Sequence, residues 1–376
     1  MNNPEGDDPR IIDCHVHFTD LESDGRFLEI MDIANIDKMN LLSTIDALKL
    51  NFNPELIYMK RSYPHLFYIF GALEYPAWIY SGTNLDSRRV KRTSLVKQVD
   101  ELMDIGFDGI KMIEAHARWR KYVGPLNNRR YKEFFKHVES LQFPLLMHAR
   151  ASELGKRSYD TELRRYNEKQ YPLWVRQAGW QHPLLKKARI EVADMIQRCP
   201  DLKVIFAHFG GLAYVSPEQT PYILDSYKNL YLDVTPGMMM YNWTERRDEW
   251  REIFLKYQDR ILFGTDVSSR QSLDVAVELI QRVRRFLETE DPVTWGFIPK
   301  REPTIGFNLP EHVLRKIYAE NFERVVGKNP KELKVEAAIA KCERMAKMMR
   351  DAGPWPYRVK NTAEQVGNLL RQNRDD

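Results

Sequence analysis

The chain has 376 residues, of which 43% are hydrophobic and 29% charged, and its formal net charge is +4. This length suits one large α/β barrel or two ordinary domains, each with a full core. The small net charge, with no basic run interleaved with aromatic residues, argues against nucleic-acid binding. No apolar run is long enough to cross a membrane, and the acidic N-terminus is unlike a secretory signal. Three scattered cysteines cannot build a disulfide framework, so we expect a cytoplasmic protein.

Short apolar runs alternate with helix-like segments along the whole chain. Eight runs are predicted as strands, at residues 11–18, 38–48, 66–74, 106–114, 143–148, 202–211, 230–235 and 261–266. Helical spacing is found between them, at residues 21–37, 54–63, 94–105, 131–141, 190–198 and 245–257. Continuous apolar runs are typical of parallel strands covered on both faces. Eight such units predict an α/β fold, a (β/α)8 TIM barrel with insertions. A doubly wound sheet is the alternative, but no Gly-x-Gly-x-x-Gly follows the first strand.

Two segments exceed what a bare barrel needs. Residues 151–183 form a long insertion after strand 5, rich in tyrosine and tryptophan. A long segment of this kind is typical of a functional loop, so we expect a lid over the barrel mouth. Residues 328–376 contain two helix-like stretches, 332–350 and 362–371. The predicted organisation is therefore a barrel over 1–327 and a helical C-terminal extension that packs on the barrel or on a neighbouring subunit.

The first predicted strand, Ile-Ile-Asp-Cys-His-Val-His-Phe, carries two histidines. Its alternation places Asp13, His15 and His17 on one face of the strand. The intervening residues Ile12, Cys14, Val16 and Phe18 are predicted to face an apolar layer. Two imidazoles on one face can bind one zinc or similar ion. Two buried core histidines with hydrogen-bond partners are the alternative.

Polar side chains mark the ends of several other predicted strands. Strand 5 ends at His148, strand 6 at His208 and strand 8 at Asp266. Barrel enzymes carry their catalytic groups at the C-terminal ends of the strands. Together with His15 and His17, these residues predict a metal site with an open position for water.

These motifs resemble one known family. The stretches are Ile11–Phe18, Met147–Ala149, Ala207–Gly211, Phe263–Asp266 and Ile317–Phe322. They are similar to the amidohydrolase superfamily, in its amidohydrolase-related branch of hydrolases, lactonases and decarboxylases of the aminocarboxymuconate-semialdehyde type. The resemblance covers residues 11–327. It implies that the metal ligands are His15, His17, His148 and Asp266. It also implies that His208 binds a second metal or acts as acid–base and electrophile, and that the cofactor is a divalent ion, zinc or alternatively manganese.

Strand 4 separates members of this superfamily that bind one metal from those that bind two. Binuclear members carry a bridging carboxylated lysine or a glutamate there, and Lys111, Glu114 and His116 are candidates in this chain. Adjacent strand positions alternate, so Lys111 and Glu114 cannot share a face. The stretch from Gly106 to Ile110 looks like the decarboxylase-type branch, which binds one metal. We therefore favour one ion, with Lys111 as a structural or substrate-facing residue; a lysine reaching out between the helices is the alternative.

Basic and aromatic residues close to the strand ends are candidates for substrate binding. Arg150 follows His148, and Arg118 and Trp119 follow strand 4. Guanidinium can bind a carboxylate through two hydrogen bonds, although solvated loop arginines are common. Lys111, Glu114 and His116 complete the candidate substrate-binding set.

The resulting hypothesis is a metal-dependent hydrolase acting on a small, carboxylated molecule, with Asp266 and His208 as catalytic residues. The alternative is a metal-dependent, non-oxidative decarboxylase, and a third possibility is a non-catalytic metal-binding scaffold. Structural zinc sites are normally closed by four protein ligands, which argues against the scaffold. We expect a small-molecule substrate, a homo-oligomer, and neither nucleic acid nor a membrane as partner.

Overall fold

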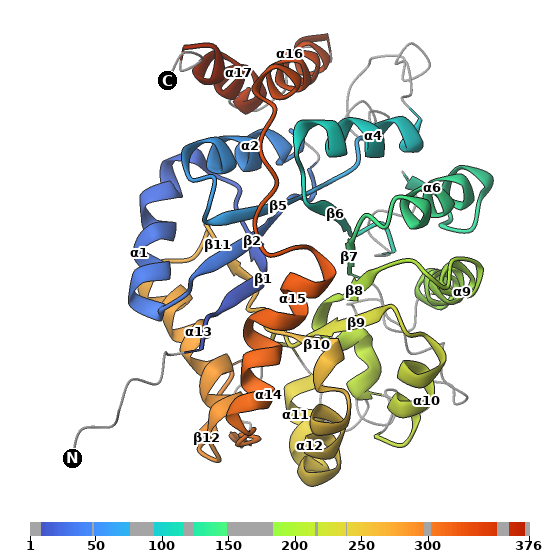
Figure 1. Ribbon diagram of the computed structural model, residues 1–376, viewed down its shortest axis with the longest axis vertical. Coiled ribbons are helices and arrows are strands. Elements are labelled where there is room, and N and C mark those ends of the chain that lie inside the picture. The colour runs from blue at the N-terminus through green and yellow to red at the C-terminus, as the bar shows by residue number, and fades with distance from the viewer. Residues whose placement is uncertain are drawn as a thin grey trace.

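A curled parallel sheet surrounded by helices forms the centre of the protein (Figure 1). The computed structural model describes residues 9–46, 49–75, 94–115, 123–148, 183–214, 217–237, 239–296, 302–351 and 361–372. The nine-stranded sheet has the order β10-β9-β8-β7-β6-β5-β2-β1-β11. Its strands are β1 (Ile12–His17), β2 (Lys38–Leu42), β5 (Phe67–Gly71), β6 (Gly109–Met112), β7 (Leu145–Met147), β8 (Val204–Phe206), β9 (Leu230–Asp233), β10 (Ile261–Leu262) and β11 (Val267–Ser268). Each of the eight predicted runs contains a strand of this sheet, but some runs were predicted too long: the strand in 38–48 ends at Leu42, and 202–211 turns into a 3-10 helix at Ala207.

The last predicted strand, residues 261–266, begins with β10, and β11 follows directly after it; these two short strands close the sheet. β10 pairs with β9, whereas β11 pairs with β1 at the opposite end of the strand order. Between them, the backbone N–H of Cys14 donates to the carbonyl of Phe263 (2.9 Å), and that of Asp266 donates to the carbonyl of His15 (2.8 Å). The two ends of the sheet are therefore joined through one short segment, as the predicted TIM-barrel fold requires.

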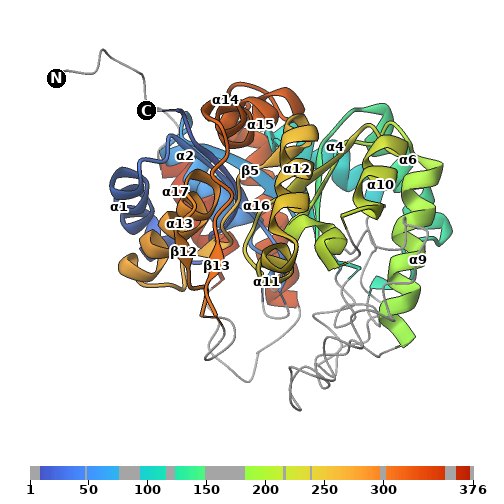
Figure 2. The ribbon, with the colours of Figure 1, turned by 90° about the horizontal axis from the view of Figure 1, so that it is seen from below.

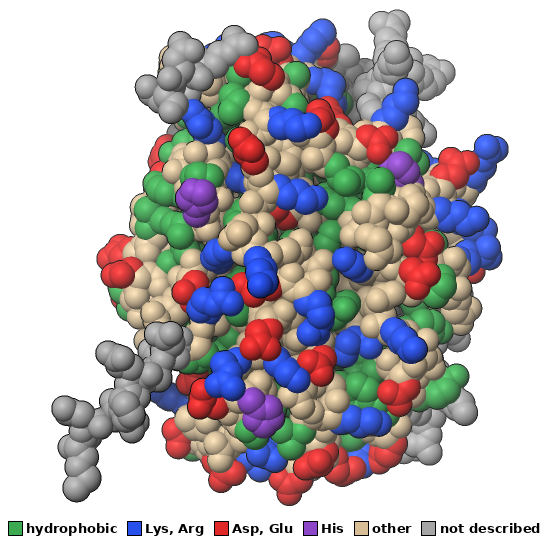
Figure 3. All heavy atoms as spheres, in the orientation of Figure 1, with side chains coloured by type: hydrophobic (Ala, Val, Ile, Leu, Met, Phe, Trp, Pro, Cys, Tyr) green, Lys and Arg blue, Asp and Glu red, His purple; other side chains and the backbone are tan. Residues whose placement is uncertain are grey.

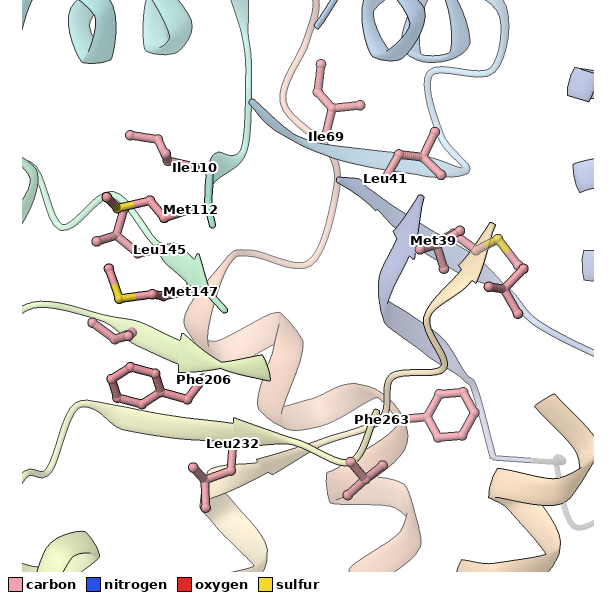
Figure 4. Packing of buried hydrophobic residues seen from close by; sticks show 14 of the residues in the cluster. Met39, Leu41, Ile69, Ile110, Met112, Leu145, Met147, Phe206, Leu232 and Phe263 are labelled. Carbon is pink, nitrogen blue, oxygen red and sulfur yellow. The ribbon is translucent and has the colours of Figure 1, made fainter. Parts of the chain in front are cut away.

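Amphipathic helices cover the outside of the sheet. They are α1 (Asp24–Ala34), α2 (Asn53–Ser62), α4 (Leu95–Ile105), α6 (Arg129–Ser140), α9 (Pro183–Arg198), α10 (Gln219–Ser226), α11 (Met239–Glu245), α12 (Arg247–Lys256) and α13 (Leu273–Glu288). Alternate strand residues such as Leu41, Ile69 and Ile110 point outward into this layer (Figure 4). Two short hairpins, β3 (Ile45–Asp46) with β4 (Leu50–Asn51) and β12 (Pro292–Val293) with β13 (Thr304–Ile305), lie outside the main sheet.

The other face of the strands forms a smaller inner core. Tyr68 and Phe70 of β5 belong to it, together with Leu146 of β7 and Ile205 of β8. The helical segment α14 (Glu311–Arg315), a π-helical turn (Lys316–Glu320) and α15 (Asn321–Val325) lies across one end of the sheet (Figures 1 and 2). Phe322 packs on Tyr68 with ring centroids 4.9 Å apart, which closes that end of the barrel.

Side chains of β1 do not alternate strictly as the sequence predicts. Ile12 and Cys14 pack in the inner core, whereas Val16 and Phe18 pack in the outer layer. The prediction that all four face one apolar layer was therefore wrong. The physical reason is an irregularity in the pairing of β1 with β2 between Asp13 and Val16, since a bulge shifts the alternation by one residue.

The C-terminal helices α16 (Val335–Asp351) and α17 (Thr362–Gln372) pack against each other and against α4 and α2 respectively (Figure 1). A buried ion pair supports this packing, because Lys341 Nζ lies 2.6 Å from Glu74 Oε1. Arg344 Nη1 lies 2.6 Å from the other oxygen of Glu74, and its Nη2 lies 2.7 Å from Glu101. The end of β5 is therefore tied to α16 through charged groups.

Charges of both signs are interspersed on the face of the molecule seen in Figure 3. Many of them are paired, as in Arg10 with Glu323 (2.8 Å) and Lys316 with Asp259 (3.0 Å). Among the described residues, no helix is both long and apolar enough to cross a membrane.

Candidate active site

Three polar side chains converge where β1 meets the segment between β10 and β11. Potential ligand atoms of His15, His17 and Asp266 all lie within 4.8 Å of one another. Asp266 Oδ1 is 3.2 Å from His17 Nε2 and 3.6 Å from His15 Nε2. The register of β1 on β11 causes this approach, because Val16 pairs with Val267 and so places Asp266 level with His15.

Both imidazoles of β1 use Nδ1 for an anchoring contact and direct Nε2 toward Asp266. His15 Nδ1 lies 2.8 Å from Asp233 Oδ2, and His17 Nδ1 lies 3.3 Å from the carbonyl oxygen of Leu42. Each acceptor favours the tautomer with a proton on Nδ1. The lone pair on Nε2 is then available to a metal ion, which is the arrangement found around many metal-bound histidines.

The protonation states of this group suit metal binding. Burial, together with the nearby charge of Lys111, lowers the pKa of His15 to about 4, so its imidazole is neutral at pH 7. Burial by itself would raise the pKa of Asp266, but its close contacts with the imidazoles of His17 and His15 hold that pKa well below its usual range. A neutral imidazole and an ionised carboxylate are the forms that bind divalent ions.

Asp233 is a site residue that the sequence reasoning missed. This buried residue ends β9 and accepts from His15 Nδ1, from the backbone N–H of His208 (2.7 Å) and from that of Thr235 (3.1 Å). Burial opposes its ionisation, but the hydrogen bond from His15 and the charge of Lys111 keep the pKa of Asp233 below the usual value. The signal was present, because Asp233 is the charged residue near the end of the seventh predicted strand, residues 230–235.

His208 lies beside both His15 and His148. Its ring centroid is 5.5 Å from that of His15 and 4.8 Å from that of His148. His208 Nδ1 lies 3.3 Å from the carbonyl oxygen of Pro236, which leaves Nε2 for another partner. His148 is not part of the group formed by His15, His17 and Asp266, although its ring lies beside that of His208.

The backbone at two of these residues adopts an unusual conformation. His208 has a φ of 53° and Asp266 a φ of 63°, both in the left-handed region that non-glycine residues seldom occupy. Such conformations cost free energy and cluster at functional sites. Gly264 contributes to the same close packing, because a Cβ there would lie 2.7 Å from Thr235 Oγ1 and 3.1 Å from His15 Cβ.

Lys111 points into the barrel, toward the histidines. Its neighbours Ile110 and Met112 belong to the outer layer, so Lys111 occupies the inner face of β6. Its Nζ lies 3.1 Å from His15 Nε2, which excludes a lysine reaching out between the helices. Burial lowers the pKa of Lys111 to about 8, although Asp233 and Asp266 act in the opposite direction.

Glu114 is directed away from the histidines, as the alternation along the fourth predicted strand (β6 in the structure) predicts. Its Oε1 accepts a hydrogen bond from the hydroxyl of Tyr75 (2.8 Å), which also lies 2.7 Å from the hydroxyl of Tyr131. Burial raises the pKa of Glu114 to about 7. This carboxyl group joins the residues that follow β5 and β6 to the start of α6.

Some predicted site residues lie outside the part of the chain that the structure describes. They are His116, Arg118, Trp119, Arg150 and residues 151–182 of the predicted lid.

The residues that converge here fit a divalent metal ion. Two imidazole nitrogens and one carboxylate oxygen form a donor set that zinc and similar ions accept. The anchored Nδ1 atoms of His15 and His17 add to this fit, because they fix both rings with Nε2 toward one point.

Comparisons with known proteins agree with this architecture. The family profile described as Amidohydrolase matches residues 12–333. Similar solved structures include IDCase from Metarhizium anisopliae in apo form, at 15% identity and a TM-score of 0.50, covering 85% of this chain and 97% of that chain. Another is 2,6-dihydroxybenzoate decarboxylase from Rhizobium, at 16% identity and a TM-score of 0.48, covering 84% of this chain and 98% of that chain.

No match is found among the curated proteins. At 15% identity the likeness to IDCase concerns the fold alone. The family profile, by contrast, spans most of the chain, from β1 to the residues just before α16. The chain therefore belongs to the amidohydrolase superfamily.

Proposed function

We propose that this chain is a metal-dependent hydrolase that acts on a small, carboxylated molecule. The observation that carries the proposal is the convergence of His15, His17 and Asp266 at the ends of β1 and β10. His148 is proposed as the fourth ligand on the basis of the family resemblance. The preference for a carboxylated substrate comes from Arg118 and Arg150, which follow strands 4 and 5 in the sequence.

A divalent ion, when bound, would supply Lewis acidity and lower the pKa of a water molecule toward neutrality. Asp266 would act as the general base, because its carboxylate stays ionised and can accept a proton from the attacking water. In its doubly protonated form, His208 would donate a hydrogen bond from Nε2 to the oxygen that gains negative charge, while its Nδ1 donates to the carbonyl oxygen of Pro236. Asp233 would keep His15 in its tautomer and His208 in its backbone position.

The test is a reaction screen with isotopic labels. Chelator-treated protein is reloaded with zinc or manganese and incubated with carboxylated esters, lactones, amides and ring acids in ¹⁸O-labelled water. Hydrolysis places ¹⁸O in the product. Release of carbon dioxide, with solvent hydrogen on carbon, would instead establish the decarboxylase alternative. Metal binding without turnover of any of these compounds would favour the scaffold.

Asp266→Ala is the inactive reference for this screen, and His65→Ala is its matched control. His65 is an exposed histidine between α2 and β5. Activity that is lost in the first variant and kept in the second would locate the reaction at this site.

A further inference from the structure

Lys111 shares one atom of His15 with the proposed metal ion. The lysine is 2% exposed, and its Nζ lies 3.1 Å from His15 Nε2 across the inside of the barrel. An ammonium group has three donors and no acceptor. The contact therefore requires the lone pair on Nε2, which is the pair that a metal ion would also require.

His15 has no second nitrogen with which to serve both partners. Its Nδ1 lies 2.8 Å from Asp233 Oδ2, and both side chains are buried. A flip of the ring would place Nε2 against Asp233 and would leave the same conflict at Nδ1. Lys111 and a metal ion therefore cannot use His15 at the same time.

The local charges point in the same direction. Asp233 and Asp266 are the carboxylates that act most strongly on Lys111, and Glu114 has a smaller effect. The ammonium group offsets part of this negative charge. Without the ammonium group the region would be more negative by one charge, which favours a divalent cation. The lysine charge also repels a cation at short range.

We propose that Lys111 competes with the divalent ion for His15 Nε2. This competition lowers the metal affinity of the site. The inference rests on the proposed function, because it needs a metal site at His15, His17 and Asp266. Lys111 acts here as a residue that determines cofactor affinity and not as a ligand.

The experiment measures metal affinity directly. Chelator-treated wild-type protein, Lys111→Met and Lys111→Arg are titrated with zinc and with manganese in competition with a chromogenic chelator. Methionine keeps an unbranched side chain without the charge, whereas arginine keeps the charge. We expect Lys111→Met to bind the ion about ten- to a hundredfold more tightly, the size of a lost charged hydrogen bond. Lys111→Arg should bind no more tightly than the wild type.

Thermal unfolding with chelator present shows whether each variant is folded. If Lys111→Met does not fold, Lys111→Leu takes its place as the uncharged variant. Weaker metal binding by a folded, uncharged variant would overturn the inference and make Lys111 part of the ligand set. Affinities within twofold of the wild type would overturn it as well. Failure of the wild type and every variant to bind an ion would instead reject the metal-dependent function itself.

Discussion

His15 Nδ1 lies 2.8 Å from Asp233 Oδ2, and the two side chains are no more than 1% exposed. Because a carboxylate only accepts hydrogen bonds, this contact fixes the proton of His15 on Nδ1. The ability of His15 on β1 to bind a metal ion therefore depends on Asp233 at the end of β9.

Asp233→Asn tests this dependence. The amide can donate to Nδ1 and so permit the other tautomer, in which Nε2 carries the proton. We expect metal affinity to fall about ten- to a hundredfold, as is typical when the partner of a metal-bound histidine is changed. A competition titration measures the change. Asp248→Asn, at an exposed position of α12, is the control, and an unchanged affinity in Asp233→Asn would contradict the role of Asp233.

His208→Asn separates catalysis from metal binding. His208 lies beside His15 and His148 but outside the group of converging ligand atoms. We expect metal content to stay near that of the wild type while turnover falls about a hundred- to ten-thousandfold, the usual contribution of an acid–base group. Elemental analysis and steady-state kinetics give the two values. Equal loss of metal and activity would make His208 a ligand.

The sequence predicts much of the fold because parallel strands covered on both faces are short apolar runs with polar residues at their ends. For the same reason the order of residues along the chain is enough to assign His15, His17 and Asp266 to one end of the barrel. The face of Cys14 cannot be predicted, because it depends on an irregular pairing of β1 with β2. The contact of Lys111 with His15 joins residues 96 positions apart, so it depends on how the sheet curls.

Glu114→Gln tests the effect of a buried carboxyl group on stability. Burial raises the pKa of Glu114 from 4.5 to about 7, so the folded protein binds this proton more tightly than the unfolded chain. Glu114 therefore lowers stability as the pH rises from about 4.5 to 7, and this loss is complete above pH 7. Glutamine keeps an acceptor for Tyr75 and avoids the charge.

We therefore expect Glu114→Gln to be more stable than the wild type at pH 8, by up to about 3 kcal/mol. The difference should nearly vanish at pH 4. Chemical denaturation at both pH values measures it, with the exposed Glu252→Gln as control. A variant that is less stable than the wild type at pH 8 would show that the carboxylate is favoured in the folded state.

Glu74→Gln tests the attachment of the C-terminal helices. Burial would raise the pKa of Glu74, but Lys341 and Arg344 lower it to about 2. A lowered carboxylate pKa contributes stability above about pH 4.5, and this contribution is lost as the pH falls toward 2. At pH 7 we expect Glu74→Gln to lose about 3 kcal/mol, near the lower end for a broken buried pair, because Glu101 still contacts Lys341 (2.7 Å).

Chemical denaturation at pH 7 measures this loss, and the exposed pair of Lys347 with Asp351 supplies the control. Asp351→Asn should change stability by less than about 1 kcal/mol, since exposed ion pairs contribute little. Adding Lys341→Met to Glu74→Gln should restore part of the lost stability, because it removes a buried charge whose principal partner is gone. A loss below about 1 kcal/mol in Glu74→Gln alone would mean that apolar contacts, and not this ion pair, hold α16 on α4.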